Sequence, residues 1–433
     1  MLMKLYHRLI SIDEAKSILT KSLLTLEKGT EEIDLKNAYG RILAEEVFAK
    51  IDSPPFDRSE VDGYAVNHMF VAGAEEDSPV RLKIQFSVNP GEYVKEPLIQ
   101  GYAAEISTGA MIPRGADAVV MEEFTKRVGN EIEIYRSVAP GENIASAGSD
   151  VLIGDITLQK NTLLDAPKIA LISSLGYSKI KVYRRLKAGI ISTGNELLNP
   201  GESLVPGKLY DANAYSIISY MEMMGLEWKY YGICRDDENE IKNRLIEAIG
   251  ENDIVFTSGS TSAGKGDIIY KIIEENGELL FHGLLIKPGK PTLAGKINNK
   301  IIIGLPGFPF SALSVLEFII KPAITDFLSN GKKENKIIAK SMLKLRSSKK
   351  VDEFIPVGII KKGDQYYFYP VNSQSGSITS MIFSDGIAML SREINYVNEN
   401  ENLEIKVINE NFDSYKITGI GSHCPLLDDI LIN

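Results

Sequence analysis

The sequence contains few residues of the kinds that bind soft metals or form covalent cross-links. Its 433 residues include 2 cysteines, Cys234 and Cys424, which lie far apart and belong to no motif. The 4 histidines are scattered and show no spacing typical of a zinc site. These absences argue against a disulfide-stabilised fold and a thiolate metal centre, and they favour a reducing compartment. A bound metal is therefore expected to be a hard cation on oxygen ligands.

Long apolar runs and a basic excess are also missing. No run of about 18 consecutive apolar residues occurs, so the sequence predicts no transmembrane helix. Charged residues such as Lys4 and Asp13 interrupt the N-terminal segment, which lacks the apolar region of a signal peptide. The formal net charge is −10 at pH 7, and this argues against nucleic acid and anionic membranes as partners. We expect a cytoplasmic protein, in which a local basic pocket can still bind a small anion.

The length and the periodicity of the chain indicate several domains. A length of 433 residues corresponds to roughly three domains of ordinary size. Helical spacing over residues 11–26 predicts a helix that starts at a capping box of Ser11 and Glu14, and a second short helix is expected over 35–45. Residues 54–140 contain short alternating stretches separated by glycine and proline, which indicate a β-rich module.

Strands and helices alternate between residues 187 and 328. The expected strands are 188–193, 228–233, 253–259 and 300–307, and the expected helices are 212–226, 237–252, 267–277 and 309–328. This alternation is typical of βαβ units with a largely parallel sheet, in which ligands bind at the carboxyl ends of the strands. The last segment, 341–433, returns to short alternating strands and predicts a small β-barrel or sandwich.

The loop 257–267 is the most informative segment for function. It follows a strand and precedes a helix, so its free backbone N–H groups and the helix N-terminus favour a phosphate. The loop resembles a Walker A motif, but Gly266 stands where that motif needs a hydroxyl for Mg²⁺. A P-loop ATPase and a turn without a ligand therefore remain alternatives. Asp267 is either a helix cap or a functional carboxylate, and with Glu196, which follows the strand 188–193, it could hold Mg²⁺ or act as a general acid or base.

Two further segments are candidates for anion binding. Lys287 and Lys290 lie on a turn rich in proline and glycine, where both ammonium groups can converge on an oxyanion. Pro309 is well placed to start the next helix, whose free N–H groups and the Ser311 hydroxyl form a second candidate site. A solvated turn and an ordinary helix start are the structural alternatives.

Taken together and in chain order, these segments resemble the molybdopterin molybdenumtransferase family, which includes MoeA and the E domain of gephyrin and its relatives. The matching stretches are PPFDRSEVDGYAV, STGAMIPRGADAVVMEE, PGENIASAGSDV, ISTGNEL, YDANAYSI, TSGSTSAGKGD, KPGKPTLAG and LPGFPFSAL, which span residues 54–315. Each stretch is weak by itself, but the series in this order is highly specific.

The resemblance implies the final step of molybdenum cofactor synthesis. In that step molybdate, or tungstate as its competitor, is inserted into the dithiolene of adenylylated molybdopterin, AMP is released, and Mg²⁺ assists. Because the pterin brings its own sulfur, the enzyme needs no metal-binding thiols. The resemblance also implies a homodimer, in which the β-rich module reaches the active site of the other subunit, and a MogA- or MoaB-like adenylyltransferase as a partner. A non-catalytic scaffold is another alternative, against which the two retained carboxylates argue.

The resemblance implies roles for particular residues. Asp267 and Glu196 would be catalytic and would hold Mg²⁺, and the further catalytic positions would be Asp62, Thr108 and Asp150. The residues that would bind the nucleotide phosphate, the oxyanion and the pterin are Ser258, Gly259, Ser260, Gly264, Lys287, Pro288, Lys290, Pro309 and Ser311.

The fold implied by the resemblance is multidomain, α/β plus β. An elongated discontinuous module would comprise residues 1–50 and 145–180, with a β-rich domain inserted at 51–144. A MogA-like α/β catalytic domain with a mainly parallel sheet would span 181–329, and a C-terminal β-barrel would span 335–433.

The chain departs from the family pattern at five positions. Asn195 replaces an aspartate, Ser260 replaces a glycine, and Lys265 stands where glutamate is common. Phe308 replaces an asparagine beside the candidate oxyanion site, and Asp352 stands where an arginine often precedes Glu-Phe. These changes leave the choice between molybdate and tungstate open.

Overall fold

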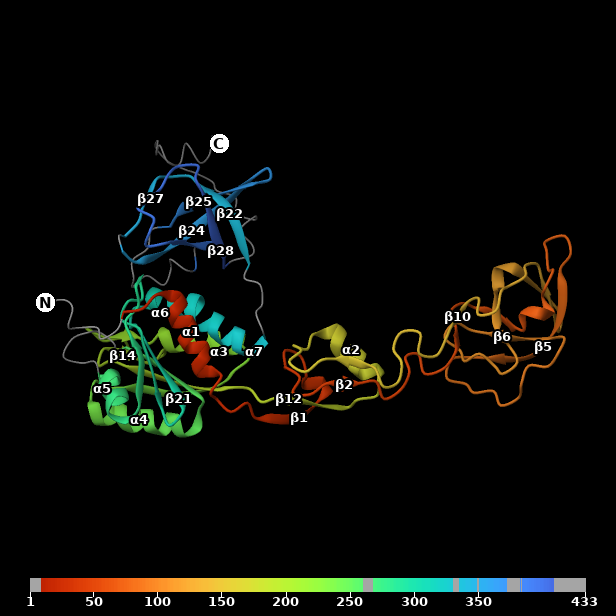
Figure 1. Cartoon of the computed structure of the whole chain (residues 1–433), viewed down its shortest axis with the longest axis horizontal. Helices are drawn as coiled ribbons and strands as arrows, with labels where there is room; N and C mark the ends of the chain where they lie inside the picture. Colours follow the sequence, from red (N-terminus) through yellow and green to blue (C-terminus); the bar gives the residue numbers. More distant parts are fainter. Residues whose placement is uncertain are drawn as a thin grey trace. The chain divides into compact units, whose positions relative to one another are not determined.

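The computed structural model describes residues 9–259, 268–329, 335–348, 350–371, 382 and 384–408. The chain divides into two compact units (Figure 1). The α/β–barrel unit contains Met1–Lys28 and Arg184–Asn433, and the β-rich unit contains Gly29–Tyr183. The predicted fold class, a multidomain α/β plus β protein, is confirmed.

A six-stranded sheet forms the centre of the α/β–barrel unit. Its strands are β13 (Lys187–Thr193), β16 (Glu227–Cys234), β17 (Ile254–Ser258), β18 (Glu278–His282), β20 (Leu293–Ile297) and β21 (Lys300–Leu305). They follow the order β16-β13-β17-β21-β20-β18, in which the first four are parallel and β20 runs antiparallel to both of its neighbours, β21 and β18. The mainly parallel sheet expected from the sequence is thus present.

Helices cover both faces of this sheet, as Figure 1 shows. One face packs against α4 (Glu238–Glu251) and α5 (Ile268–Asn276); the other packs against α1 (Ile12–Leu23), α3 (Asn213–Met223), α6 (Pro309–Val315), the π-helical turn η5 (Leu316–Ile320) and α7 (Lys321–Ser329). Neighbouring strand residues point to opposite faces, so Ile190 lies in one core and Ile191 in the other.

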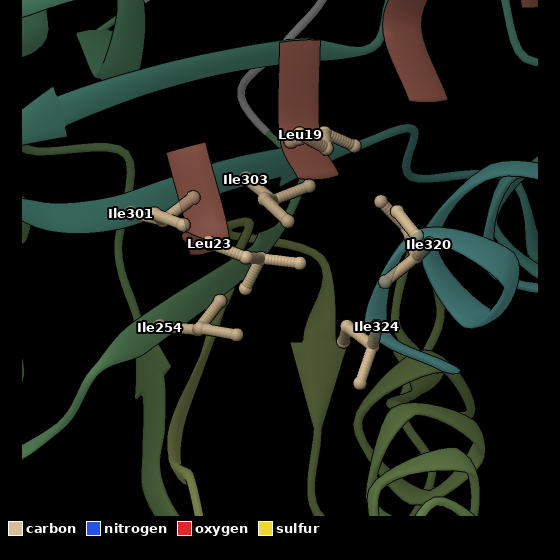
Figure 2. Close-up of a pocket in the computed structure, with 8 residues that line it drawn as sticks. Leu19, Leu23, Ile254, Ile301, Ile303, Ile320 and Ile324 are labelled. Carbon is tan, nitrogen blue, oxygen red and sulfur yellow. The ribbon is translucent and has the colours of Figure 1, made fainter. Parts of the chain in front are cut away.

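Helix α1 begins at the predicted capping box and buries its apolar face in this domain. The Ser11 hydroxyl accepts a hydrogen bond from the Glu14 N–H at 3.3 Å, and the Glu14 carboxylate accepts one from the Ser11 N–H at 3.0 Å. Leu19 and Leu23 line a small apolar pocket together with residues of β17, β21, η5 and α7 (Figure 2). The segment up to Lys28 belongs to the same compact unit as the α/β domain, and the predicted extent of the discontinuous module, residues 1–50 and 145–180, stays a prediction.

The C-terminal strands close into a five-stranded barrel. The strands are β22 (Lys336–Ser341), β24 (Asp352–Lys362), β25 (Gln365–Pro370), β26 (Gly386–Leu390) and β28 (Asn402–Val407). They follow the order β24-β25-β22-β28-β26, and β26 pairs back with β24 to close the ring. The short strand β19 (Ile286–Lys287) of the α/β domain pairs in parallel with β24, and β23 (Leu345–Arg346) pairs with β27 (Tyr396–Val397). The predicted C-terminal barrel is therefore present.

The β-rich unit contains a second six-stranded sheet in the order β7-β4-β6-β5-β9-β8. Its strands are β4 (Gly63–Val66), β5 (Val80–Val88), β6 (Tyr102–Ile106), β7 (Ala118–Met121), β8 (Thr125–Val128) and β9 (Glu131–Ile134), with the turns η3 (His68–Phe70) and η4 (Glu122–Phe124). Tyr64 and Ala65 belong to separate hydrophobic cores because consecutive residues of β4 point to opposite faces.

The segments on either side of this sheet pair with each other. These pairs are β1 (Thr30–Asp34) with β12 (Lys179–Tyr183), β2 (Val47–Phe48) with β11 (Ile156–Leu158), and β3 (Arg58–Ser59) with β10 (Ile144–Ala145), and α2 (Ala166–Ser174) completes the set. The prediction of a helix over residues 35–45 is wrong, since the helical structure there is limited to the 3₁₀ turn η2 (Leu35–Asn37). Leu43 instead forms a β-bridge with Val182, which lies in β12, so this part of the segment is extended.

Candidate active site

The carboxyl ends of three adjacent parallel strands form one edge of the α/β sheet. β13 ends at Thr193, β17 at Ser258 and β21 at Leu305. The Thr193 hydroxyl donates a hydrogen bond to the Ser258 carbonyl at 3.1 Å, and the Gly259 N–H donates one to the Leu305 carbonyl at 3.3 Å. These bonds join the three strand ends, at the position where parallel α/β sheets bind ligands.

Gly259 follows directly after β17 in the candidate phosphate loop and has a backbone conformation that only glycine tolerates there. Its φ is +94°, and a Cβ atom at this position would lie 2.3 Å from the Thr193 carbonyl oxygen. At Gly307 a Cβ atom would lie 3.7 Å from the Gly259 Cα, which is ordinary contact. The backbone at Gly259 therefore lies against the Thr193 carbonyl at the strand ends, a close approach that a residue with a side chain could not make.

Asn213 holds this edge together and was not singled out in the sequence analysis. Its side chain is 7% exposed, and its amide nitrogen donates to the Ser258 hydroxyl at 2.7 Å and to the Gly307 carbonyl at 2.8 Å. The start of α3 is thereby tied to the end of β17 and to the segment before α6. The buried Asp211 accepts from the Ala214 N–H at 3.0 Å and from the Tyr230 hydroxyl at 2.8 Å. Burial, followed by the Asp211 carboxylate, raises the pKa of Tyr230.

The only signal for these residues in the sequence is the pair of polar residues at the start of the predicted helix 212–226. Asp211 and Asn213 stand within the stretch YDANAYSI, just before the apolar face of that helix begins. Polar residues at a helix start are usually caps, so the pattern does not distinguish an exposed cap from a buried connector.

Glu196 is exposed beside the same strand ends. A Cβ atom on Gly194 would lie 2.8 Å from both carboxylate oxygens of Glu196, so the carboxylate lies over the glycine backbone. Within the part of the chain that the structure describes, this carboxylate has no hydrogen bond or ion pair. Its predicted partner Asp267 lies outside the described residues, as do Ser260, Gly264 and Lys265.

The chemistry of these oxygen donors fits a hard cation. No cluster of three or more His, Cys, Asp or Glu residues that could hold a metal occurs among the described residues. Mg²⁺ does not need such a cluster, because it usually keeps several waters and binds one or two carboxylates together with substrate phosphates. An exposed carboxylate beside the ends of parallel strands, such as that of Glu196, suits this mode, and Mg²⁺ binding by Glu196 and Asp267 stays a prediction.

The lysine turn lies where the α/β domain contacts the barrel. The Lys287 ammonium is exposed but donates to the Ser348 hydroxyl at 2.8 Å and to the Glu353 carboxylate at 3.2 Å. Pro288 is partly buried, and Lys290 is exposed. One of the two predicted oxyanion-binding cations is thus held by barrel residues.

The candidate site at the start of α6 has one exposed and one buried side chain. Pro309 is the first helical residue, as predicted, and Phe308 precedes it as the N-cap without a side-chain capping bond. Phe308 is 62% exposed, whereas Ser311 is 4% exposed. Ser311, whose hydroxyl was predicted to bind an anion here, is therefore largely covered by protein.

The β-rich unit brings two of its three predicted residues together. The Asp62 carboxylate accepts a hydrogen bond from the Thr108 N–H at 2.8 Å, and both side chains are exposed. Asp150 is also exposed, but its N–H donates to the Ser53 carbonyl at 3.0 Å, on the segment that leads into the sheet.

Comparison with known proteins relates all parts of the chain to one family. Three family models match: the MoeA N-terminal region (domain I and II) over residues 10–176, a probable molybdopterin binding domain over 189–326, and the MoeA C-terminal region (domain IV) over 339–408. A putative molybdopterin biosynthesis protein of Methanocaldococcus jannaschii is 32% identical over 418 residues, which cover 94% of this chain and 100% of the relative. The chain belongs to the molybdopterin molybdenumtransferase family.

Further relatives agree with this assignment. A molybdopterin molybdenumtransferase of Haemophilus influenzae is 35% identical over 321 residues, covering 73% of this chain and 77% of that protein. The crystal structure of a molybdopterin biosynthesis MoeA protein from Pyrococcus horikosii matches with a TM-score of 0.80 at 36% identity, covering 94% of this chain and 100% of that one. The resemblance found in the sequence is confirmed, and the family consists of transferases of molybdenum cofactor biosynthesis. No helix in the described ranges is long and apolar enough to cross a membrane.

Proposed function

We propose that this chain catalyses the final step of molybdenum cofactor biosynthesis. It inserts molybdenum from molybdate, or tungsten from tungstate, into the dithiolene of adenylylated molybdopterin and releases AMP. The observation that carries the proposal is the edge where the ends of β13, β17 and β21 meet at Thr193, Ser258 and Gly259, with the exposed Glu196 carboxylate beside it. That the substrate is a molybdopterin is inferred from membership of the family.

Each group at this edge has a task in the release of AMP. The loop after Ser258, including Ser260 and Gly264, binds the phosphates through its N–H groups, and Asn213 keeps the base of the loop in place. Glu196 and Asp267 would hold Mg²⁺, which would offset phosphate charge and polarise the phosphoanhydride. Water adds to the adenylyl phosphorus, the phosphoanhydride bond breaks so that the molybdopterin phosphate leaves, and a carboxylate of this pair accepts the proton of the water.

The insertion half of the reaction requires positive charge for a dianionic oxyanion. Lys287 and Lys290 supply it from their turn, and Pro288, Pro309 and Ser311 shape the adjoining pocket for the oxyanion and the pterin. The dithiolene provides both sulfur ligands, so the scarcity of cysteine in the chain is compatible with molybdenum chemistry.

The β-rich unit contributes to the reaction across a homodimer. Asp62, Thr108 and Asp150 act at the site of the partner subunit, and a MogA- or MoaB-like adenylyltransferase supplies the adenylylated substrate. Light scattering measures the dimer directly. Mixing inactive Asp62→Asn with inactive Glu196→Gln protein restores activity if the subunits share their sites, and the absence of restoration contradicts shared sites.

An assay on purified protein tests the proposed function. The chain is incubated with adenylylated molybdopterin, Mg²⁺ and either molybdate or tungstate, and both AMP and finished cofactor are measured. We expect AMP release that depends on Mg²⁺, and we expect Asp267→Ala to abolish cofactor formation while the fluorescence of Trp228, which is the only tryptophan, is unchanged.

Glu247→Ala is the matched control, because it removes an exposed carboxylate from α4 of the same domain and should leave the rate unchanged. Full activity of Asp267→Ala would contradict the assigned role. Hydrolysis of ATP without pterin would instead favour the P-loop ATPase suggested by the Walker-like loop.

A further inference from the structure

Among the described residues, the side-chain partners of the Lys287 ammonium belong to the barrel and not to its own domain. Its Nζ atom donates to the Ser348 hydroxyl at 2.8 Å and to Glu353 Oε1 at 3.2 Å. Lys287 and Glu353 are register partners in the parallel pair β19–β24, so the two side chains leave directly adjacent backbone positions. The pairing of the two strands therefore places the two side chains next to each other.

The Glu353 carboxylate is itself held on several sides. It is 15% exposed, and it accepts from the Ser348 N–H at 2.6 Å and from the Ser348 hydroxyl at 3.0 Å. The residue before it, Asp352, donates its N–H to the Leu285 carbonyl at 2.9 Å. The residue after it, Phe354, stacks on Phe318 with ring centroids 4.3 Å apart. Glu353 is thus a rigid acceptor at the junction of the barrel with the α/β domain.

The geometry leaves the ammonium group able to bind one more acceptor. A lysine ammonium has three N–H donors, and Ser348 and Glu353 engage two of them. The side chain is 62% exposed, so the remaining donor is accessible to a ligand. A flexible lysine that is already oriented loses less conformational entropy when it binds an anion.

We propose that Glu353 and Ser348 of the barrel are positioning residues for Lys287, whose third N–H donor binds the oxyanion substrate. The inference rests on the proposed function and adds the barrel to the residues on which oxyanion binding depends. Asp352 does not take part, because its carboxylate accepts from the Arg392 N–H at 2.9 Å and faces a neighbouring turn of the barrel.

The test is a double-mutant cycle on the full chain. Glu353→Ala, Lys287→Met and the double variant are assayed for the molybdate concentration that gives half-maximal cofactor formation. We expect Glu353→Ala to raise that concentration roughly tenfold with a smaller change in the maximal rate, since a lost or misaligned hydrogen bond to a charged group weakens binding by about that factor or more. In the Lys287→Met background, Glu353→Ala should have no further effect, whereas additive effects would overturn the proposal.

Two milder variants cover the case in which Glu353→Ala disturbs the barrel. Ser348→Ala removes one acceptor of Lys287 without touching the carboxylate and should raise the same concentration by a smaller factor. Glu353→Gln keeps an acceptor oxygen and should recover part of the loss. The control is Glu404→Ala, which removes an exposed barrel carboxylate paired with Lys336 and should leave the molybdate dependence unchanged.

A readout without turnover separates this inference from the proposed function. The Lys287 ammonium is observed by nuclear magnetic resonance in protein with labelled lysine, with molybdate alone as the probe. We expect a signal of restricted motion in the wild type that becomes mobile in Glu353→Ala and shifts with molybdate only in the wild type. If the wild type forms no cofactor but shows this behaviour, the proposed function fails and the positioning stands. If the ammonium is equally mobile in both proteins, the positioning fails.

Discussion

At the scale of single residues, two glycines at the candidate active site make opposite steric demands. Gly259 has φ +94° and lies so close to Thr193 that a Cβ atom would come within 2.3 Å of its carbonyl oxygen. Among the described residues, a Cβ atom on Gly307 would have only the Cα of Gly259 within 4 Å, at 3.7 Å. The first glycine is required by the backbone, whereas the second makes ordinary contact with the described residues.

Alanine substitutions should separate these two glycines. We expect Gly259→Ala to lower the free energy of unfolding by about 2 kcal/mol, because left-handed strain and the clash with Thr193 both act against a side chain. Gly307→Ala is the matched control and should change it by less than about 0.5 kcal/mol. Urea unfolding followed by Trp228 fluorescence reports on this domain, since Trp228 lies in β16. Equal losses in both variants would contradict the steric argument.

The sequence predicted which residues lie at the strand ends, but it did not predict the side chains that link separate elements. The strand-end positions of Thr193 and Ser258 follow from the alternation of strands and helices. The connection of Asn213 to Ser258 spans 45 residues and that of Lys287 to Glu353 spans 66, so both depend on how separate elements pack. No local spacing encodes such contacts. The resemblance likewise implied functional roles for Asp62 and Thr108, but nothing in their spacing predicted the hydrogen bond from the Thr108 N–H to the Asp62 carboxylate.

At the scale of elements, α1 shows how a terminal helix becomes part of a distant core. Its buried residues Leu19 and Leu23 face Ile254 of β17 and Ile320 and Ile324 of the last helical segments, as Figure 2 shows. All lining side chains of this pocket are aliphatic or alanine, so the association depends on apolar burial and close packing.

Truncation of one of these leucines should therefore be costly. Leu19 is 2% exposed, and Leu19→Ala would enlarge an existing apolar pocket that has no polar group to hold water. We expect a loss of about 2–5 kcal/mol in the free energy of unfolding. Leu24→Ala at the C-cap of the same helix removes a side chain that is 63% exposed and should cost less than about 0.5 kcal/mol. A small effect at Leu19 would mean that α1 does not stabilise the domain.

The bounds of helices were predicted best where the helical spacing of apolar residues extends over several turns. The helix expected over 237–252 is α4, Glu238–Glu251, and the helix expected over 309–328 is present but contains the π-helical turn η5. That turn carries Glu317, whose buried carboxylate accepts from the Tyr220 hydroxyl at 3.0 Å and pairs with Lys406 of the barrel at 3.0 Å. The periodicity could not reveal these contacts, because Lys406, which also donates to the Glu317 carbonyl at 3.0 Å, lies 89 residues away along the chain.

At the scale of the whole molecule, one charged cluster lies where the chain passes between the two units. The chain leaves the α/β–barrel unit after Lys28 and returns at Arg184. Arg184 binds Asp253 at the start of β17 with both terminal nitrogens, at 2.6 and 3.0 Å, and also reaches the Glu27 carbonyl at 3.4 Å. The cluster therefore ties both crossing points to the central sheet.

The ionisation of Asp253 makes this anchor dependent on pH. Burial opposes the charge of the carboxylate, but hydrogen bonds from Arg184, the Lys187 N–H and Lys300 outweigh burial and lower the pKa of Asp253 from 3.8 to about 2. Since the folded state favours the charged form, the contribution to stability is complete above pH 3.8. It is lost as the pH falls from there towards 2, where Asp253 becomes protonated in the folded state as well.

Removal of the arginine should accordingly destabilise the α/β domain at neutral pH and much less in acid. We expect Arg184→Met to lower the free energy of unfolding by about 2 kcal/mol or more at pH 7, because a carboxylate that is 5% exposed loses its bidentate partner. Lys242→Met, which breaks an exposed pair with Glu275 in the same domain, should cost less than about 1 kcal/mol. Urea unfolding followed by Trp228 fluorescence at a series of pH values measures both variants. If the loss for Arg184→Met were the same at pH 7 and near the lowered pKa of Asp253, the stabilisation would come from packing of the arginine and not from its charge.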